Sequence, residues 1–372
     1  MTQLADDRSV IQQVLDHIDG GTTDLAAGSW REPVEHYRSP ERLELELERV
    51  LRRTPTPFCP SAALAEPGAY IAREAAGVPL LVVRARDGVV RAFRNACRHR
   101  GVQLAEGSGC ATAFVCPYHG WVYGQDGALR HIPDAAGFPD VDPATRGLVP
   151  VRAEERHGLV FVTQDGPAEA SPELDVLAGV LTPDLRLHSA TITDVAANWK
   201  IFMDGFLEGY HLRATHKQTF YPLQFDNLNV VEHFGRNTRI VFPYRRIEKQ
   251  RALPPADRSP AGSLTYVYHL FPNAVVATFP VSVSLIINEP VGVDRTRVHN
   301  YILTTLDVDD PEATAALKRG VDLQVDGLSE DLAMAHSIQR GLASGANEHF
   351  EFGRYEGALT HFHRGLAQVI DG

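Results

Sequence analysis

Two short stretches of the chain each combine a cysteine with a histidine. Cys97 and His99 lie in CRHRG, and Cys116 and His119 lie in CPYHGW. Two thiolates and two imidazoles can hold one tetrahedral zinc ion. They can also hold a 2Fe-2S cluster in which the cysteines bind one iron and the histidines bind the other. Zinc sites usually group the cysteines apart from the histidines, so the mixed stretches favour the cluster.

The residues around these ligands fit tight loops. Gly101 and Gly120 allow the backbone to turn sharply near the sulfurs, and Pro117 stiffens the second loop. The chain has four cysteines, too few for a disulfide framework, and Cys59 and Cys110 are expected to be ordinary thiols. A reducing compartment suits such a cysteine–histidine site.

A second stretch, NWKIFMDGFLEGYHLRATH, contains Asp204, Glu208, His211 and His216. Residues on a helix turn by about 100° each, so the first three share one face. His216 lies roughly 140° from His211, so both reach one metal only if the helix bulges or ends between them. Two histidines and a carboxylate form the ligand set of non-haem Fe(II) oxygenases, which leaves positions open for O2.

The carboxylate must come from elsewhere in the chain, which has 47 acidic residues. The best candidates are Glu330 and Asp331 in LSEDLAMAHSIQRGL. The alternative is that both complement a helix dipole behind an N-cap at Ser329. His336 on the same helix is expected to be structural.

These motifs resemble the α (terminal oxygenase) subunit of the Rieske non-haem iron aromatic-ring-hydroxylating oxygenases. The similarity rests on Cys-x-His, sixteen residues, and Cys-x-x-His, together with NWK and an acid three residues before YH. It covers nearly the whole chain, roughly residues 40–370. The resemblance implies a Rieske cluster and a mononuclear Fe(II), and assigns them Cys97, His99, Cys116 and His119, and His211, His216 and Asp331, respectively.

Further roles follow from the same resemblance. Glu208 would bridge an iron-binding histidine to a Rieske histidine of the next subunit, with Asp204 as the alternative. Most members carry aspartate there, and some that act on quaternary amines carry glutamate. Asn198 would lie near the iron, and Glu330 is the runner-up to Asp331 as the third ligand.

The resemblance also implies partners. No glycine-rich dinucleotide fingerprint is present, so electrons from NAD(P)H are expected through a separate reductase, with or without a ferredoxin. A head-to-tail homotrimer would supply the subunit interface. The expected reaction is mono- or dihydroxylation, or oxidative demethylation, of a small organic compound. An aromatic substrate is the first expectation, and a quaternary amine or an alicyclic compound is the alternative. A Rieske electron carrier without catalysis, or a ligand-binding module that has lost its iron, is a more distant reading.

Three regions must position these residues. Residues 1–56 are expected to be a helical segment that packs with the catalytic domain, with Ser39 as an N-cap before Pro40. Residues 57–165 read as a small antiparallel β-domain that carries the cluster. Residues 166–372 read as the catalytic domain. The fold class is therefore α+β, a Rieske β-domain ahead of a helix-grip (START/SRPBCC-like) domain with a large antiparallel sheet flanked by helices.

The elements within the catalytic domain can be predicted more finely. A linker is expected at 163–175 and a helical stretch at 190–220. Strands are expected at 237–246, 263–280, 281–292 and 297–308, and helices at 310–325, 328–343 and 356–371. Aromatic side chains from helix and sheet could line the substrate pocket or form plain core, and could hold a quaternary amine by cation–π contact. They are Phe202, Phe206, Tyr210, Phe220, Tyr221, Phe225, Phe271 and Phe279.

Composition excludes several classes of protein. The chain has 372 residues, a net charge of -11 and a pI of about 5.8. This charge argues against a nucleic-acid or anionic-membrane surface. No stretch approaches the ~20 apolar residues of a membrane span. The first residues lack the basic start and apolar region of a signal peptide, so a cytoplasmic location is expected.

Overall fold

The computed structural model describes residues 4–166 and 172–372. The chain forms two compact units, Leu51–Ser171 and Met1–Val50 with Pro172–Gly372. The predicted linker at 163–175 falls partly on 167–171, outside the described residues. Within the described ranges, no helix combines the length and apolar composition needed to cross a lipid bilayer.

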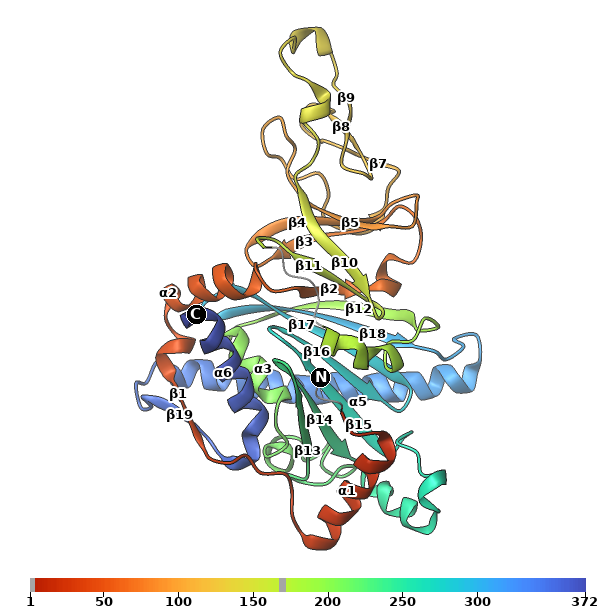
Figure 1. The fold of residues 1–372 in the computed structure, drawn as a ribbon, viewed down its shortest axis with the longest axis vertical. Coiled ribbons are helices and arrows are strands. Elements are labelled where there is room, and N and C mark those ends of the chain that lie inside the picture. The colour runs from red at the N-terminus through yellow and green to blue at the C-terminus, as the bar shows by residue number, and fades with distance from the viewer. Residues whose placement is uncertain (1–3, 167–171) are drawn as a thin grey trace. The chain divides into compact units, whose positions relative to one another are not determined.

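The smaller unit consists of two antiparallel sheets joined by turns (Figure 1). One sheet has seven strands in the order β2-β11-β10-β5-β4-β3-β6, and the other has three in the order β7-β8-β9. The strands are β2 Thr56–Pro60, β3 Ala69–Ala75, β4 Val78–Arg84, β5 Val90–Arg94, β6 Gly107–Cys110, β7 Ala113–Val115, β8 Val122–Gly124, β9 Leu129–His131, β10 Pro150–Arg156 and β11 Leu159–Thr163. Short 3-10 turns lie at η3 Ser61–Leu64, η4 Ala135–Gly137 and η5 Pro143–Thr145.

The core of this unit includes the two cysteines of the paired motifs. Cys97 and Cys116 are buried in one cluster with Phe93, Phe114 and Tyr123. Because these side chains come from β5, β7 and β8, the sheets hold both loops at their bases.

The larger unit is built on a seven-stranded antiparallel sheet in the order β12-β18-β17-β16-β15-β14-β13. Its residues are rich in valine, isoleucine and threonine, which favour strands. The strands are β12 Arg186–Val195, β13 Val230–Phe234, β14 Asn237–Pro243, β15 Leu264–Leu270, β16 Ala274–Phe279, β17 Ser282–Gly292 and β18 Arg295–Thr304. This sheet with its helices confirms the predicted α+β class.

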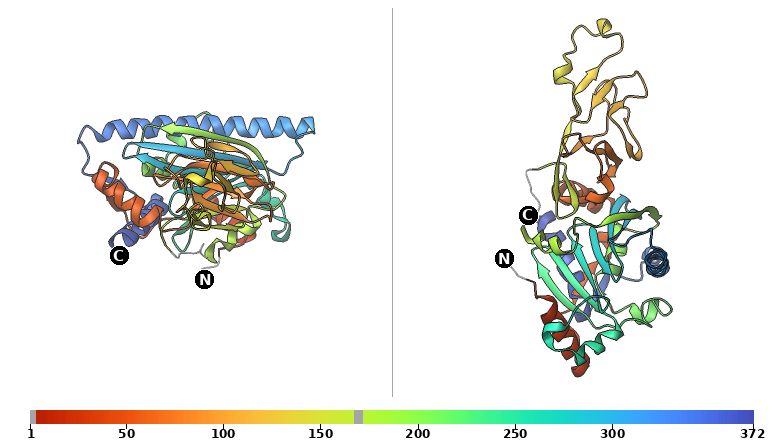
Figure 2. Two further views of the ribbon diagram at one scale, coloured as in Figure 1. Left: turned by 90° about the horizontal axis from the view of Figure 1, so that it is seen from above. Right: turned by 90° about the vertical axis from the view of Figure 1, so that its right-hand side faces the viewer.

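Helices surround the sheet, and Figure 2 shows α5 as one long helix beside it. A short strand β1 Trp30–Pro33 pairs with β19 His349–Phe352. The helices are α1 Asp7–Gly20, α2 Pro40–Leu45, α3 Trp199–Phe206, α4 Leu212–Thr215, α5 Pro311–Leu342 and α6 Gly357–Asp371. Shorter helical turns are η1 Val34–Tyr37, η2 Glu46–Leu51, η6 Pro172–Gly179, η7 Arg245–Ala252, η8 Pro255–Asp257 and η9 Arg354–Glu356.

The predicted start of α2 is confirmed. The Ser39 hydroxyl accepts a hydrogen bond from the Arg42 N–H at 3.0 Å, and Pro40 occupies the first helical position. The N-terminal segment is less purely helical than expected, because β1 lies within it.

The prediction of two helices at 310–325 and 328–343 is wrong. They form the single 32-residue helix α5, which begins at an N-cap on Asp310. Ser329 is therefore an interior residue and not a cap. Gly327 lies inside this helix, and the Phe220 ring packs so close to it that an added Cβ atom would lie 2.3 Å from Cε2.

The helical stretch expected at 190–220 is also shorter and interrupted. Strand β12 continues to Val195, α3 ends at Phe206, and α4 spans one turn. The interruption contains Gly209, where an added Cβ would lie 2.3 Å from Oδ1 of Asn229. This close approach of Asn229 requires glycine and separates the two helices.

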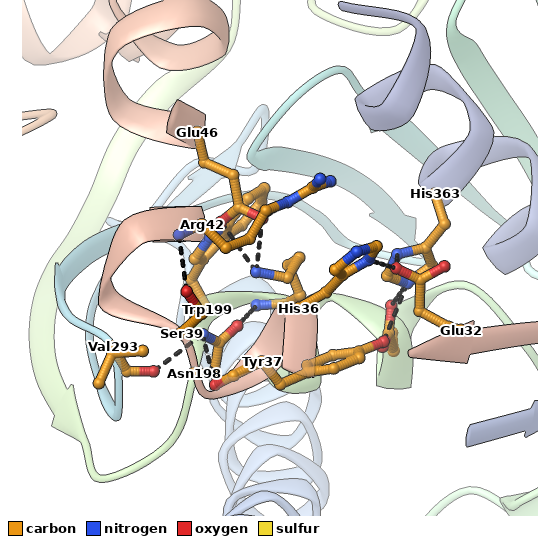
Figure 3. A network of polar contacts seen from close by, with 12 residues as sticks. Glu32, His36, Tyr37, Ser39, Arg42, Glu46, Asn198, Trp199, Val293 and His363 are labelled. Atoms are coloured by element: carbon orange, nitrogen blue, oxygen red, sulfur yellow. Dashed lines mark hydrogen bonds and ion pairs between the residues drawn. The ribbon is translucent and has the colours of Figure 1, made fainter. Parts of the chain in front are cut away.

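Buried charges anchor the start of α3. Glu46 accepts hydrogen bonds from Lys200 Nζ at 2.8 Å, Trp199 Nε1 at 2.9 Å and Arg42 Nε at 3.1 Å (Figure 3). Glu46 and Lys200 are both almost fully buried. A buried charge is tolerated only when it is paired in this way, so the contacts fix α3 against the N-terminal segment.

Candidate metal centres and active site

The two cysteine–histidine loops of the smaller unit have the same backbone design. Cys97 N–H donates to Val102 O, and Gly101 N–H donates to Cys97 O, both at 2.8 Å. In the second loop Cys116 N–H donates to Trp121 O at 2.8 Å, and Gly120 N–H donates to Cys116 O at 3.0 Å. The first loop follows β5 and the second joins β7 to β8.

Glycine is required in both loops. Gly101 has a φ of 81° and Gly120 a φ of 72°, a backbone region that other residues rarely adopt. The predicted sharp turns near the sulfurs are therefore present.

The histidines of the two loops face each other, with ring centroids 4.7 Å apart. Nδ1 of His99 is buried and has no hydrogen-bond partner among the described residues, whereas Nε2 of His119 contacts Arg100 at 2.7 Å. Trp121 stacks on His99 at 5.0 Å with an interplanar angle of 7°. The unpaired Nδ1 of His99 is what a metal-binding imidazole requires.

The thiol of Cys97 is also positioned by a neighbour. The Tyr123 hydroxyl lies 3.3 Å from Cys97 Sγ and accepts the Arg98 N–H at 2.9 Å. Burial and the Cys97 contact raise the pKa of Tyr123, which keeps its hydroxyl protonated. The hydroxyl can therefore donate to a thiolate.

The spread of the four ligand atoms favours a cluster over a single ion. Within residues 4–166 and 172–372, the one group of metal-binding side chains whose ligand atoms lie within 4.8 Å of one another is His211, His216 and Asp331. The cysteine–histidine set is more widely spaced than one tetrahedral zinc requires. A 2Fe-2S cluster, with one iron for the thiolates and one for the imidazoles, fits it.

The second site brings two histidines and one carboxylate together in the larger unit. Nε2 of His211 and Nε2 of His216 lie 3.2 Å apart. Oδ1 of Asp331 lies 3.6 Å from the first nitrogen and 3.1 Å from the second. This is the donor set of mononuclear non-haem Fe(II) sites, so these three residues fit that ion.

The broken helix explains how both histidines reach one point. His211 is the residue before α4, and His216 is the residue after it. The helix therefore begins and ends between them, as the five-residue spacing required. Asp331 comes from the middle of α5.

Each histidine has a carboxylate on its other ring nitrogen. Nδ1 of His211 donates to Oε1 of Glu208, whose other oxygen accepts the backbone N–H groups of Tyr210 and His211. Nδ1 of His216 donates to Glu330 Oε2 at 2.8 Å, and the Thr219 hydroxyl donates to the same oxygen at 2.6 Å. Such outer partners fix the tautomer and ring orientation of metal ligands.

These acidic partners dominate the electrostatics. Burial alone would lower the pKa of His211, but Glu208 and Asp331 raise that pKa to about 9. Burial also acts to lower the pKa of His216. Asp331 and Glu330 outweigh that effect, so the pKa of His216 is raised. The site therefore attracts positive charge, which a divalent cation supplies.

Asn198 and His336 have structural contacts, as was expected for His336 only. Asn198 is fully buried and caps α3: its Oδ1 accepts the Lys200 N–H at 3.0 Å, and its Nδ2 donates to Val293 O and Tyr37 O (Figure 3). It does not line the pocket beside His211 and Asp331. His336 accepts the Ala196 N–H at 3.2 Å, a structural contact.

Asp204 belongs to a separate buried network. Its Oδ1 accepts from Nε2 of His363 at 2.9 Å and its Oδ2 accepts from the Tyr37 hydroxyl at 2.8 Å. Nδ1 of His363 faces Glu32 at 3.4 Å. Glu208, and not Asp204, thus contacts a histidine of the site.

A pocket opens beside the three candidate ligands, with about 730 Å³ of empty space including its mouth. Its walls come from α3, α4, α5 and the strands β14 to β18. Four phenylalanine rings line it, together with uncharged polar side chains, and its acids are Glu208 and Asp331. No lysine or arginine is among the described residues of its lining.

Three of the eight predicted aromatic residues line this pocket: Phe206, Phe220 and Phe279. Phe202 and Phe271 belong to the core, and Tyr210 is exposed. Sequence reasoning missed Phe242, which sits in an all-buried strand without a distinguishing pattern. It also missed the contacts of Glu330 and Thr219 with His216.

Comparison with known proteins agrees with these sites. Residues 182–372 match the family described as ring hydroxylating alpha subunit (catalytic domain), and residues 54–144 match the Rieske [2Fe-2S] domain. Choline monooxygenase, chloroplastic, of Spinacia oleracea is 30% identical over 355 residues, 91% of this chain and 78% of that protein. The carnitine monooxygenase oxygenase subunit of Escherichia coli K12 is 30% identical over 370 residues, 92% and 94% of the two chains.

Solved structures share the fold. The quaternary ammonium Rieske monooxygenase CntA in complex with L-carnitine matches with a TM-score of 0.79 and 24% identity over 99% of both chains. Naphthalene 1,2-dioxygenase from Rhodococcus sp. bound to indole matches with a TM-score of 0.77 and 20% identity, also over 99% of both.

The chain belongs to the family of ring-hydroxylating α subunits. It is a Rieske non-haem iron oxygenase, with a Rieske 2Fe-2S cluster and a mononuclear iron as its cofactors. It works with a reductase, O2 and an organic substrate. The resemblance inferred from the motifs, and the class of enzyme it implied, are confirmed.

Proposed function

We propose that the chain is a monooxygenase of a small substrate with a quaternary ammonium group. One observation carries this proposal: the pocket combines phenylalanine rings with acidic side chains and lacks a basic residue among its described lining. Aromatic faces and carboxylates both attract an organic cation. Relatives named as choline and carnitine monooxygenases support the same class.

The residues that would hold the cofactors follow from the geometry above. We assign the Rieske cluster to Cys97, His99, Cys116 and His119, within the electron-carrying region 57–165. We assign the mononuclear iron to His211, His216 and Asp331, within the catalytic region 166–372, against which residues 1–56 pack. When bound, the cluster supplies single electrons and the iron activates O2.

The protein groups around the iron ligands have separate tasks. Glu330 and Thr219 orient His216, and Glu208 holds the proton on Nδ1 of His211. The phenylalanine walls exclude water and hold the substrate beside the ligands. Orientation of this kind raises the rate because the reacting groups no longer have to find each other.

We further propose that Glu208 connects His211 to a Rieske histidine of a neighbouring subunit in a head-to-tail trimer. Its carboxylate already contacts His211, and 11% of its side chain remains exposed. The electrons would come from NAD(P)H through the reductase, with or without a ferredoxin. The thiolate ligands suit the reducing cytoplasm as the location.

The test is turnover with a surrogate reductase, NADH and a panel of ammonium compounds, following O2 consumption and the oxygenated product together. Product formation in step with O2 uptake is expected for at least one quaternary amine. O2 uptake without any such product, across the whole panel, would contradict the proposal.

An aromatic substrate is the second candidate. The phenylalanine rings that suit a cation also suit an aromatic ring, which prefers edge-to-face contacts with them. The rings alone do not decide between the two, and the relatives named as choline and carnitine monooxygenases favour the ammonium compound. Including indole and naphthalene in the same panel separates these candidates.

A further inference from the structure

Most polar side chains of the substrate pocket are already paired within the protein. Ser284 Oγ donates to Gln324 Oε1 at 2.8 Å. Gln324 Nε2 donates to Ser282 Oγ at 3.0 Å and to Gly320 O at 3.1 Å. Thr265 Oγ1 donates to the Tyr244 hydroxyl at 3.3 Å. These groups therefore have partners within the protein and do not need a substrate to pair them.

Asn300 is different. Its Oδ1 is buried and has no hydrogen-bond partner among the described residues. It lies on the interior strand β18 opposite Ile286 of β17, and both residues line the pocket. Buried polar groups are almost always paired, so an unpaired amide in a binding pocket indicates a ligand that completes it.

The contacts of α5 with β17 show how far along the pocket Asn300 lies, because the two elements run side by side. Gly320 approaches Val281, and Gln324 contacts Ser282 and Ser284. Further along, His336 of α5 reaches Ala196, whose neighbour Ala197 accepts from Thr296 at 2.7 Å.

Thr296 pairs with Pro290 of β17, and Asn300 pairs with Ile286, between Pro290 and Ser284. Asn300 therefore lies at a level of the pocket between Gln324 and His336. Asp331 lies in the same interval of α5, about 10 Å along the helix from Gln324. Asn300 is thus on the pocket wall beside the candidate iron ligands.

We propose that Asn300 is a specificity-determining residue that hydrogen-bonds a neutral hydroxyl group of the substrate. The inference rests on the proposed function and narrows it to a quaternary ammonium alcohol. A hydroxyl can donate to Oδ1 of Asn300, which as an amide oxygen only accepts.

A carboxylate is disfavoured at this position. The pocket has no basic side chain among its described lining, and its charged groups beside the histidines are Glu208 and Asp331. An ionised carboxylate has no proton to donate, so it cannot pair with Oδ1 of Asn300, which only accepts. The amide alone cannot neutralise that charge.

The experiment compares choline with ethyltrimethylammonium, which lacks only the hydroxyl, and with glycine betaine, which carries a carboxylate. Binding is measured by calorimetry and turnover with the surrogate reductase, in wild type and in Asn300→Leu. The wild type is expected to prefer choline over ethyltrimethylammonium by at least about tenfold in kcat/KM, because unpaired polar groups reject analogues that lack their partner. Asn300→Leu is expected to lose this ratio, because its kcat/KM for choline should fall toward its kcat/KM for ethyltrimethylammonium.

Asn300→Ser serves as the conservative variant, since its hydroxyl can still pair with the substrate, and it should retain part of the ratio. Cluster absorbance and iron content identify variants that fail to fold. An Asn300→Leu enzyme that keeps the choline preference, or a wild type that prefers glycine betaine, would overturn the inference and leave the proposed function standing. A wild type that turns over indole but binds no ammonium compound would overturn the proposed function as well.

Discussion

At the scale of single residues, the neighbouring acids Glu330 and Asp331 have different contacts at the candidate iron site. Glu330 was a possible third ligand by sequence, but its oxygen lies on Nδ1 of His216 while Asp331 faces both Nε2 atoms. Asp331 is thus placed to bind the metal, and Glu330 is placed to orient His216.

Glu330→Gln tests that division. An amide accepts a hydrogen bond more weakly than a carboxylate does. The His216 ring should therefore be less firmly oriented and less basic. Iron affinity is expected to fall by about 10- to 100-fold, as for other outer partners of metal ligands. Iron titration of the metal-free mononuclear site measures it. Glu312→Gln, at an exposed position in the first turn of the same helix, is the control and should bind iron as the wild type does.

Glu208→Gln tests the proposed electron path. The variant should retain the cluster, and iron is supplied in excess to offset weaker binding at His211, whose outer partner is changed. Oxidation of the reduced cluster in a single turnover is expected to slow by at least about 100-fold, because a charge-assisted contact is lost. Stopped-flow absorbance of the cluster, with substrate and O2 present, gives the rate. A wild-type rate would remove Glu208 from the path.

The sequence predicts these residues unevenly, and distance along the chain is the reason. Each cysteine–histidine loop closes within six residues, so its spacing alone defines the site. The contact between His216 and Glu330 spans 114 residues. No local pattern reports such a pair, and Asp331 was reached through the family resemblance.

At the scale of elements, α5 carries both a ligand candidate and a wall of the pocket. Gly327 lets the Phe220 ring lie against the helix, and that ring packs edge-on to His216 at 5.0 Å. The two helices predicted from sequence, at 310–325 and 328–343, left this glycine between them. It could not show that a distant ring fills the space of the missing side chain.

Gly327→Ala is expected to push Phe220 off α5 and into the open pocket beside it. The substrate KM should rise by roughly tenfold, since small misplacements at a site are costly. Gly341→Ala on the same helix is the control, because an added Cβ there has nothing within 4 Å. That variant should keep the KM and gain up to about 1 kcal/mol in free energy of unfolding.

The buried network on α6 makes the stability of the larger unit depend on pH. Burial opposes the charged form of His363, but Asp204 and Glu32 raise its pKa to about 9, above the ordinary 6.5. The stabilisation is therefore complete below pH 6.5 and is lost as the pH rises through 9.

The free energy of unfolding should fall by on the order of 3 kcal/mol between these limits. Denaturant unfolding at several pH values measures it. His363→Gln should flatten this dependence. His361→Gln, the neighbouring control, should retain it, because the pKa of His361 is lowered and its charge is absent above pH 6.5. Equal slopes in wild type and His363→Gln would contradict the assignment.

At the scale of the whole molecule, the described residues of each unit contain one candidate set of metal-binding side chains, the cysteine–histidine loops in one and His211, His216 and Asp331 in the other. The enzyme class could be predicted from sequence because both sets are defined by motifs. The substrate could not, because the pocket lining runs from Gly205 to Asp331 and is assembled by the strands between them. Only the folded sheet reveals that Oδ1 of Asn300 has no hydrogen-bond partner among the described residues.

Hybrid oligomers test whether electrons cross between subunits, as the proposed trimer requires. One subunit carries His119→Ala, at an exposed loop position, to remove the cluster, and the other carries Asp331→Ala to remove the iron. Each variant alone should be inactive.

Coexpressed in equal amounts, the two variants should recover about a quarter of the wild-type activity. A random head-to-tail ring places an intact cluster beside an intact iron with that probability. Oxygen uptake coupled to product measures the recovery, and the two variants purified separately and then mixed serve as the control. Inactive hybrids that contain both subunits and both metals would show that the electrons stay within one chain, and the trimeric path through Glu208 would be wrong.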